Sequence, residues 1–376
     1  MRRVKQLALL TGTLVGVAVA AEIVLRLAVP GLALPVFRPG GYLDSQLHHR
    51  NPPNARMHDR FGLERYVVET NEDGLRSGWS RAAFRRQGVR IAVLGDSFAF
   101  GYGLPVEATL GVRLEQRLRD ELGRDDVGVL NAGIVTYSPL LSGALFDDVV
   151  RHYAPTSTLL LLDVTDVADD HMYGGQRVRG GRRSHERRFA IEDQPFPDSP
   201  LRGLALWNLA RPIRQLVAQW RPPPLPRGLR PARILIDGEE QRDQFFVMRY
   251  PLAKTRPFFQ ALLDNIDALA AAVRDAGSDF ALVIGPRHVH WDASEAPGSP
   301  ETRKYGSDAT WHAEYIRFFE QVAPQLDYPV VELLPAFQDS PRRPLVFDHD
   351  PHWNADGHAL VADELAAFLR ERASPP

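Results

Sequence analysis

The sequence predicts an α/β protein in which helices cover both faces of a central parallel sheet, preceded by one transmembrane helix. Short apolar segments alternate with longer segments of helical periodicity, and parallel strands require such crossover helices between them. The segment from Leu159 to Leu162 is wholly apolar, as is typical of a strand that is covered on both faces. Near the N-terminus, 23 residues from Leu7 to Val29 form an apolar run that is long enough to cross a bilayer.

The N-terminal segment, residues 1–30, is predicted to be a cytoplasmic tip followed by a signal anchor. Basic residues precede the apolar run, so the positive-inside rule keeps the N-terminus in the cytoplasm and exports the rest of the chain. Glu22 and Arg26 lie one turn apart inside the run and are expected to pair. A cleaved signal peptide is the alternative, because residues 18–20 read Ala-Val-Ala and follow a suitable apolar stretch.

The remaining chain is predicted to divide into a lead-in segment, residues 31–86, and a main domain, residues 87–376. The lead-in segment has mixed composition with short β-like pieces, whereas the main domain has the regular alternation of strands and helices. The predicted strands are Val89–Leu94, Val127–Leu130, Leu159–Leu162, Phe280–Ile284 and Val330–Leu334. The predicted helices are Val106–Leu122, Leu140–His152, Phe258–Ala276, Ala309–Val322 and Ala355–Arg370.

An arginine-rich insertion, at about residues 171–250, interrupts this alternation between the third and fourth strands. Residues 175–233 contain thirteen arginines and four acidic residues, so the net charge of −2 for the whole chain hides a strongly basic segment. Within it, Leu201–Trp220 is predicted to be an amphipathic helix, and the proline run that follows excludes helix and interior strand. Three interpretations stay open: a solvated loop, a patch for anionic phospholipid headgroups, and a surface for acidic polysaccharide.

Composition excludes several classes of function. The near balance of 45 basic and 47 acidic residues argues against general nucleic-acid binding. The absence of cysteine removes disulfides, thiolate metal sites, iron–sulfur clusters and cysteine nucleophiles. Any nucleophile in a catalytic site of this chain would therefore be an oxygen.

Polar residues follow the carboxyl ends of the predicted strands, where ligands bind in open α/β sheets. Residues 95–103 after the first strand read Gly-Asp-Ser-Phe-Ala-Phe-Gly-Tyr-Gly, and residues 131–133 after the second read Asn-Ala-Gly. Residues 163–166 after the third strand read Asp-Val-Thr-Asp. The last loop, residues 348–354, reads Asp-His-Asp-Pro-His-Trp-Asn, and Gly357-His358 follow it. The sheet is expected to bring these distant segments together.

These segments resemble the sequence blocks of the SGNH, or GDSL-type, hydrolases, particularly exported bacterial members with an N-terminal anchor. The resemblance extends from about Asn71 to the last helix and includes the turn at residues 71–76, Asn-Glu-Asp-Gly-Leu-Arg. It implies a flavodoxin-like three-layer fold and a serine hydrolase chemistry that needs no cofactor and no metal. It also implies a single-pass protein of the bacterial inner membrane, with the catalytic domain in the periplasm or outside the cell.

By this resemblance, Ser97 is the nucleophile, His352 is the general base and Asp350 orients the base. A serine hydroxyl is a poor nucleophile until a base takes its proton, and histidine can do so near neutral pH. The aspartate would fix the tautomer of the imidazole and stabilise the cation that forms. Asp348 is the alternative orienting residue.

The oxyanion hole is expected to contain the backbone N–H groups of Ser97 and Gly133. The family usually has Gly-x-Asn-Asp in its third block, where the asparagine side chain is a third donor. Thr165 stands at that position here. A hydroxyl can also donate, with a shorter reach. The sequence leaves open whether Thr165 substitutes for the asparagine, whether the hole has two donors, or whether another residue contributes.

Other polar residues near this edge have a structural interpretation beside a functional one. Asp96, Asp166, His288 and His290 are candidates for lining the substrate cleft; the alternatives are a turn-stabilising role for Asp96 and a solvated loop for the histidines. Arg287 would meet an anionic substrate or form a surface ion pair. Two metal sites are weaker alternatives, one formed by His349, His352 and His358 and one for calcium formed by Asp163, Asp166, Asp169 and Asp170.

The predicted function is that of an exported serine esterase or O-acyl transferase, acting on carbohydrate or other ester substrates through an acyl-enzyme. Hydrolysis and transfer differ only in whether water or a sugar hydroxyl accepts the acyl group. The pair His352-Trp353 is similar to alginate-type O-acetylation proteins, which favours glycan chemistry. The expected partners are a small-molecule or glycan ester, the membrane and a membrane O-acyltransferase, but no nucleic acid. The alternative is a non-catalytic glycan-binding or scaffold protein on a hydrolase fold.

Overall fold

The computed structural model describes residues 2–29, 37, 42–61, 64–175, 189, 193, 204–209, 233–305 and 313–373. Most of the arginine-rich insertion lies outside these residues, so its three interpretations stay predictions. Of the predicted helix Leu201–Trp220, the described residues include the short helix α7 (Ala205–Leu209).

The core is a five-stranded parallel sheet with the strand order β11-β10-β7-β5-β6. The strands are β5 (Val89–Gly95), β6 (Val127–Gly133), β7 (Ser157–Leu162), β10 (Asp279–Ile284) and β11 (Val330–Glu332). In chain order this is the arrangement 2-1-3-4-5 of flavodoxin-like folds. The predicted α/β fold class is confirmed, and each predicted strand is present.

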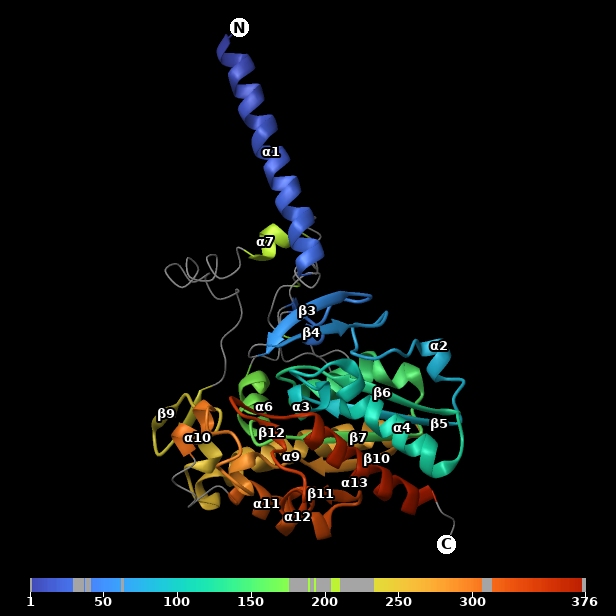
Figure 1. Ribbon diagram of the computed structural model, residues 1–376. Helices are drawn as coiled ribbons and strands as arrows, with labels where there is room; N and C mark the ends of the chain where they lie inside the picture. Colours follow the sequence, from blue (N-terminus) through green and yellow to red (C-terminus); the bar gives the residue numbers. More distant parts are fainter. Residues whose placement is uncertain are drawn as a thin grey trace.

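Helices cover both faces of this sheet (Figure 1). Successive strand residues such as Val93 and Leu94 point to opposite faces, and each enters a separate apolar core. One face is covered by α5 (Pro139–Asp148), α9 (Leu252–Asp275) and α11 (Glu314–Val322), and the other by α4 (Leu110–Leu122) and α13 (Ala355–Ala373). Apolar residues on both faces are the reason that strands such as β7 lack polar alternation.

Several predicted helices have different ends in the structure. The predicted helix Val106–Leu122 is divided at Thr109 into a 3-10 turn (Val106–Ala108) and α4. Helix α9 begins six residues before the predicted start, because Pro257 lies in its second turn instead of preceding it. Shorter elements are α2 (Arg81–Phe84), α3 (Ser97–Phe100), α6 (Asp166–Gly174), α10 (Pro300–Tyr305), α12 (Leu334–Asp339), β8 (Ile234–Ile236), β9 (Glu239–Gln241), β12 (Val346–Phe347) and β13 (Asp350–Trp353).

The lead-in segment forms two antiparallel hairpins that lie between the N-terminal helix and the sheet (Figure 1). The hairpins are β1 (Tyr42–Asp44) with β2 (His48–Arg50), and β3 (Arg56–Phe61) with β4 (Glu64–Glu69). After them, the Asn71 side chain accepts hydrogen bonds from the backbone N–H groups of Asp73 and Leu75, which fixes the turn before Arg76. The Asn71 amide also donates to the hydroxyl of Tyr153 at 3.0 Å, so the segment is packed against the main domain and is not a free linker.

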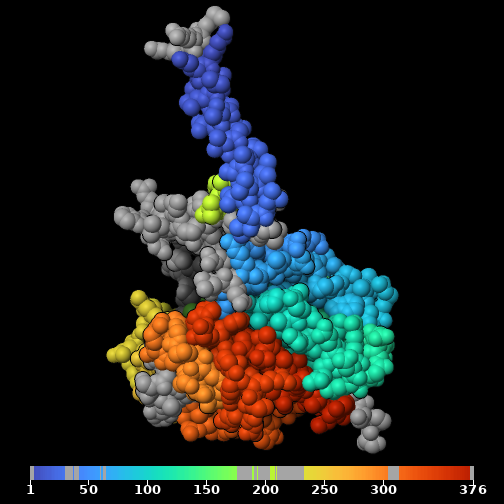
Figure 2. Space-filling view, in the orientation of Figure 1, coloured from blue at the N-terminus to red at the C-terminus, as the bar shows by residue number. Residues whose placement is uncertain are grey.

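Helix α1 (Arg2–Ala28) projects away from the rest of the molecule, and its apolar side chains are exposed (Figures 1 and 2). Residues Val4–Ala28 are long and apolar enough to cross a membrane, a property that signal sequences share. Glu22 and Arg26 form the expected ion pair at 2.7 Å. The Glu22 carboxylate also accepts hydrogen bonds from the N–H groups of Ala205 and Leu206 at the start of α7, which ties the insertion to α1.

Candidate active site

Three polar side chains meet at the carboxyl edge of the sheet. Ser97 Oγ lies 2.8 Å from His352 Nε2, and His352 Nδ1 lies 2.5 Å from Asp350 Oδ1. Asp350 Oδ1 also accepts the backbone N–H of His352 at 3.0 Å, so the carboxylate fixes both the ring and its backbone. The geometry is that of a Ser-His-Asp triad. The fold brings Ser97 and His352 together across 255 residues of sequence, as expected.

Ser97 is placed by the turn between β5 and α3. Gly95 ends the strand at a φ of +143°, and a Cβ there would lie 2.5 Å from the carbonyl oxygen of Leu161. Asp96 then caps α3, because its Oδ1 accepts the N–H of Phe98 at 2.8 Å. Ser97 is the first residue of this helix, where the backbone N–H has no partner within the helix. Asp96 therefore has the expected turn-stabilising role.

Arg76 of the lead-in segment holds the other end of α3. Its buried guanidinium donates hydrogen bonds to the carbonyl oxygens of Phe100, Gly101 and Leu104, at 3.1, 2.7 and 2.5 Å. These oxygens belong to the end of α3 and the turn after it, where a cation is favoured. The turn at residues 71–76 thus supports the short helix that carries Ser97.

The residues around His352 explain the spacing of the last sequence block. The Phe98 ring stacks on the imidazole with the ring centroids 4.8 Å apart. Trp353 is buried and donates its indole N–H to the carbonyl of Pro286 at 3.2 Å, which ties the block to the loop after β10. The Asn354 side chain accepts the N–H groups of residues 356 and 357 at the start of α13.

The alternative roles considered for neighbouring residues find other partners. Asp348 pairs with His349 Nδ1 at 2.5 Å and not with His352. His358 is buried and accepts the backbone N–H of Leu110 at 3.1 Å, and burial lowers its pKa to about 3. Within the described part of the chain, no group of three histidine or acidic side chains is arranged to hold a metal ion.

Gly133 does not provide the expected oxyanion donor. Its backbone N–H donates to the Asn131 side chain at 3.0 Å. A Cβ at Gly133 would lie 2.4 Å from the backbone nitrogen of Phe100 and 2.7 Å from the carbonyl carbon of Ala99. The glycine is required because α3 packs directly on the end of β6, which is a structural reason and not a catalytic one.

Thr165 lines the site, but its donors are used elsewhere. Its hydroxyl lies 2.5 Å from Asp163 Oδ2, and its backbone N–H donates to the same oxygen at 3.0 Å. Because a carboxylate only accepts, the hydroxyl hydrogen points to Asp163. This geometry therefore does not support Thr165 as an oxyanion donor in place of the family's asparagine.

Thr136 lines the same cavity as Ser97 and is a candidate for the remaining donor. It lies in the turn between Ile134 and Tyr137, which a hydrogen bond from Tyr137 N–H to the Ile134 carbonyl closes at 3.0 Å. Its φ is +67°, an unusual value for a β-branched residue that costs about 1–3 kcal/mol. Among the described residues, its backbone N–H has no hydrogen-bond acceptor. The sequence carries no signal for this candidate donor. A turn with a positive φ favours glycine, whereas this chain has threonine at that position.

A cavity of about 450 Å³ opens beside the triad. Its lining is mostly polar and aromatic and comprises Asp96, Ser97, Tyr102, Val135, Thr136, Thr165, Asp169, Gln244, Phe245, Arg287, Pro300, Glu301, Asp350, Pro351 and His352. Of the predicted cleft residues, Asp96 lines this cavity. Asp166 instead accepts the backbone N–H of Asp163 at 2.7 Å, below the surface.

The two predicted cleft histidines do not line the cavity either. His288 is fully buried and its Nε2 lies 2.7 Å from the Thr302 hydroxyl. His290 Nδ1 accepts the backbone N–H of Arg287 at 3.0 Å, and its ring stacks on Tyr315. Both histidines stabilise the loop after β10, and Arg287 from the same loop is the residue that reaches the cavity.

Arg287 is buried between two carboxylates and is not a free cation. Its Nε and Nη2 donate to Asp163 at 2.7 and 2.6 Å, and its Nη1 donates to Glu301 at 2.5 Å. Burial opposes the charge of Asp163, but the charge and hydrogen bonds of Arg287 outweigh it, so the pKa of Asp163 is lowered. Burial raises the pKa of Glu301 to about 7, and burial together with the charge of Asp163 raises that of Asp96 to about 7.

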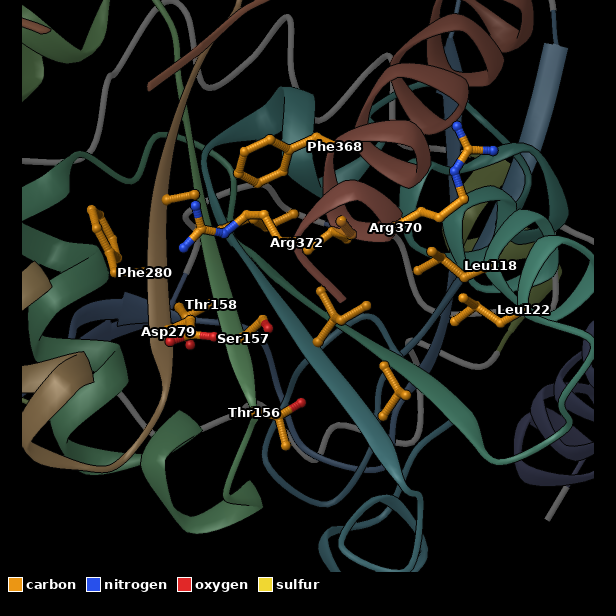
Figure 3. Close-up of a pocket in the computed structure, with 15 residues that line it drawn as sticks. Leu118, Leu122, Thr156, Ser157, Thr158, Asp279, Phe280, Phe368, Arg370 and Arg372 are labelled. Atoms are coloured by element: carbon orange, nitrogen blue, oxygen red, sulfur yellow. The ribbon is translucent and has the colours of Figure 1, made fainter. Parts of the chain in front are cut away.

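A second cavity lies at the opposite edge of the sheet (Figure 3). It measures about 210 Å³ and lies at the amino ends of β5, β7 and β10. Figure 3 shows Leu118 and Leu122 of α4 on one side and Phe368 of α13 on another. None of the triad residues lines it. Ligands of open α/β sheets bind at the carboxyl edge, so the cavity beside Ser97 is the candidate site.

Comparison with known proteins gives distant structural matches. No family model and no curated protein matches the sequence. A solved structure described as a lipolytic protein of the G-D-S-L family from Desulfitobacterium hafniense DCB-2 is 12% identical with a TM-score of 0.39, over 74% of this chain and 99% of that one. An acetylxylan esterase from Geobacillus stearothermophilus is 13% identical with a TM-score of 0.38, over 77% of this chain and 96% of that one. A lipase/acylhydrolase from Enterococcus faecalis is 14% identical with a TM-score of 0.39, over 77% of this chain and 99% of that one. The similarity is low, so the chemistry has to be derived from this chain's own residues.

Proposed function

We propose that the protein is a membrane-anchored serine esterase that cleaves small acyl esters through an acyl-enzyme. The observation that carries this proposal is the hydrogen-bonded row Ser97–His352–Asp350 at the edge of a cavity. The pKa of Asp350 is lowered, because the hydrogen bond and charge of His352 outweigh the effect of burial. An ionised carboxylate is what the orienting role requires, since it stabilises the imidazolium that forms during the reaction.

In the proposed mechanism, Ser97 Oγ attacks the ester carbonyl carbon while its proton passes to His352 Nε2. The resulting oxyanion accepts hydrogen bonds from the backbone N–H groups of Ser97 and Thr136. The bond to the alcohol oxygen then breaks, and His352 returns the proton to that oxygen. Water attacks the acyl-enzyme in the same way, and the acid and Ser97 are released.

The cavity suits an ester of a polar alcohol. Its size of about 450 Å³ lies within the usual range of small-molecule sites. Thr136, Gln244 and Glu301 offer polar groups, while Tyr102 and Phe245 offer aromatic surfaces. Such a lining favours a carbohydrate ester, as predicted from the sequence. A sugar hydroxyl that replaced water at the second step would make the same site an O-acyl transferase.

The apolar N-terminal helix supports a location of this chemistry outside the cytoplasm. With Arg2, Arg3 and Lys5 in the first turns of α1, the positive-inside rule keeps the N-terminus in the cytoplasm and favours the triad on the other side of a bacterial inner membrane. An intact α1 is favoured, because the apolar run continues past the possible cleavage site at Ala20 to Val29. The mass of the N-terminal peptide of the mature protein tests this point, since cleavage would remove the residues up to Ala20.

The esterase proposal is tested on the full chain in detergent with an aryl acetate and a fluorophosphonate probe. Wild type should hydrolyse the ester and be labelled at Ser97. Ser97→Ala should lose the label and at least about 10³-fold of the rate. Ser294→Ala is the matched control, because this serine bonds Asp292 in a loop and does not line the cavity. If wild type shows neither reaction, the non-catalytic scaffold is the better interpretation; acyl transfer to an added sugar would identify a transferase.

A further inference from the structure

The lead-in segment reaches the wall of the catalytic cavity through one buried side chain. His49 of β2 is 2% exposed, and its Nε2 lies 3.0 Å from the carbonyl oxygen of Val135 and 3.2 Å from the hydroxyl oxygen of Thr136. Val135 and Thr136 line the same cavity as Ser97. A residue from between the membrane helix and the sheet thus contacts the turn that carries the proposed oxyanion donor.

The hydrogen bonds of His49 have a defined direction. Burial lowers its pKa to about 3, so the ring is neutral at physiological pH. The Val135 carbonyl can only accept, and therefore the hydrogen of the neutral ring is on Nε2. Nδ1 is then an acceptor, and His48 Nδ1, at 2.8 Å, donates to it. The pair of histidines forms a chain of hydrogen bonds that ends on the turn.

The same turn has further bonds to the lead-in segment. The Tyr137 hydroxyl lies 3.0 Å from the carbonyl oxygen of Leu47 and 2.7 Å from that of His49. The Tyr137 ring also packs edge-on against the His49 ring, with the ring centroids 4.9 Å apart. Bonds on several sides over-determine this turn, which is the condition under which a left-handed, β-branched residue persists.

The choice of threonine at position 136 is informative. Glycine would adopt a φ of +67° without strain, but it would offer no hydroxyl to His49. The chain therefore keeps a strained residue whose side chain connects the turn to the lead-in segment. The strain lies beside the nucleophile and not at a remote loop.

We propose that His49 is a positioning residue that holds the turn Ile134–Tyr137 so that the backbone N–H of Thr136 faces the oxyanion. The inference rests on the proposed esterase function. An oxyanion donor is effective only at about 2.7–3.1 Å from the charge that develops, so a turn that shifts loses transition-state stabilisation without losing the substrate. The lead-in segment would then be part of the catalytic apparatus and not a spacer.

The test compares His49→Ala, His49→Gln and a matched control in the full chain. Thr70→Val is the control, because Thr70 is also buried in the lead-in segment, but its hydroxyl bonds only Pro52 and Ala55 of that segment. With the aryl acetate, kcat and kcat/KM of His49→Ala should fall together, by about 10–100-fold, while KM stays within about twofold. His49→Gln keeps a donor and should recover most of the rate. Thr70→Val should keep kcat within about twofold.

A second readout does not depend on catalysis. Amide hydrogen exchange of residues 134–138 should be at least about tenfold faster in His49→Ala than in wild type, and unchanged in Thr70→Val. The proposal is wrong if His49→Ala keeps the wild-type kcat, loses activity through KM alone, or exchanges at the wild-type rate. A wild type without serine-dependent turnover overturns the proposed function instead, and hydrogen exchange then decides the structural part by itself.

Discussion

The two halves of the candidate site differ in how they are built. The proton-transfer half consists of side chains, and Ser97, His352 and Asp350 form the hydrogen bonds that the sequence blocks imply. In the oxyanion half, the Gly133 N–H and the Thr165 hydroxyl donate to neighbouring side chains. The Thr136 N–H, which has no acceptor among the described residues, is the proposed oxyanion donor. The difference teaches that side chains which react are specified by residue type, whereas backbone donors are specified by the conformation of a turn.

The carboxyl groups around the cavity also differ in their electrostatics. The pKa of Asp350 is lowered, so the carboxylate beside His352 is ionised. Burial raises the pKa of Asp96, Asp169 and Glu301, which line the same cavity. The orienting carboxylate is ionised, whereas these three carboxyl groups resist ionisation.

The largest effect is expected from breaking the proton-transfer half at its orienting residue. Asp350→Asn should lower kcat/KM for the aryl acetate by about 10²–10⁴-fold, because an amide favours the wrong tautomer of His352. Asp348→Asn is the matched control: this carboxylate pairs with His349, so the rate should stay within about twofold. Equal losses in the two variants would show that the orienting residue has been misassigned.

An intermediate effect, on stability more than on rate, is expected from Thr165→Val. The variant removes a buried hydrogen bond to Asp163, which should lower the free energy of unfolding by about 1–3 kcal/mol, measured by urea denaturation. Because the hydroxyl already points to Asp163, kcat should change by less than about tenfold. A loss of 10²–10³-fold in kcat at unchanged stability would instead place Thr165 in the oxyanion hole, as the family pattern suggests.

This contrast also separates what could be predicted from the sequence from what could not. The strands β5, β6, β7, β10 and β11 follow from apolar runs, and the three side chains of the proposed triad follow from the blocks at the carboxyl ends. The turn at Thr136 did not follow, because a positive φ at a β-branched residue is imposed by tertiary contacts. Of the predicted cleft residues, Asp166 lies below the surface at the start of α6, and His288 and His290 do not line the cavity. Arg287 of the histidines' loop lies beside the cavity instead.

The lead-in segment shows the same limit at longer range. Its short β-like pieces were visible in the sequence, and β4 covers one of them. Nothing in local composition connects His49 with a turn 86 residues later, because that contact exists only after the segment has folded onto the sheet. Arg76 is an intermediate case: the block containing it was noted, but its bonds to the end of α3 depend on the tertiary structure.

The smallest effect tests the electrostatic side of the comparison through Glu301→Gln. The usual pKa of a glutamate is 4.5, and burial raises that of Glu301 to about 7, so the native state holds a proton that the unfolded state has lost between these values. Stability must therefore fall as the pH rises through this window, with a slope of at most about 1.4 kcal/mol per pH unit for this group. In Glu301→Gln this contribution disappears, and the fall in stability between about pH 4.5 and 7 should be shallower than in wild type, as measured by urea denaturation at several pH values.

Asp126→Asn is the control. The hydrogen bond of Asp126 with Arg124 lowers its pKa below 3.8, outside the window, so the pH slope of stability in this variant should match the wild type. An identical slope in Glu301→Gln and wild type would mean that Arg287 keeps Glu301 ionised, as His352 keeps Asp350 ionised.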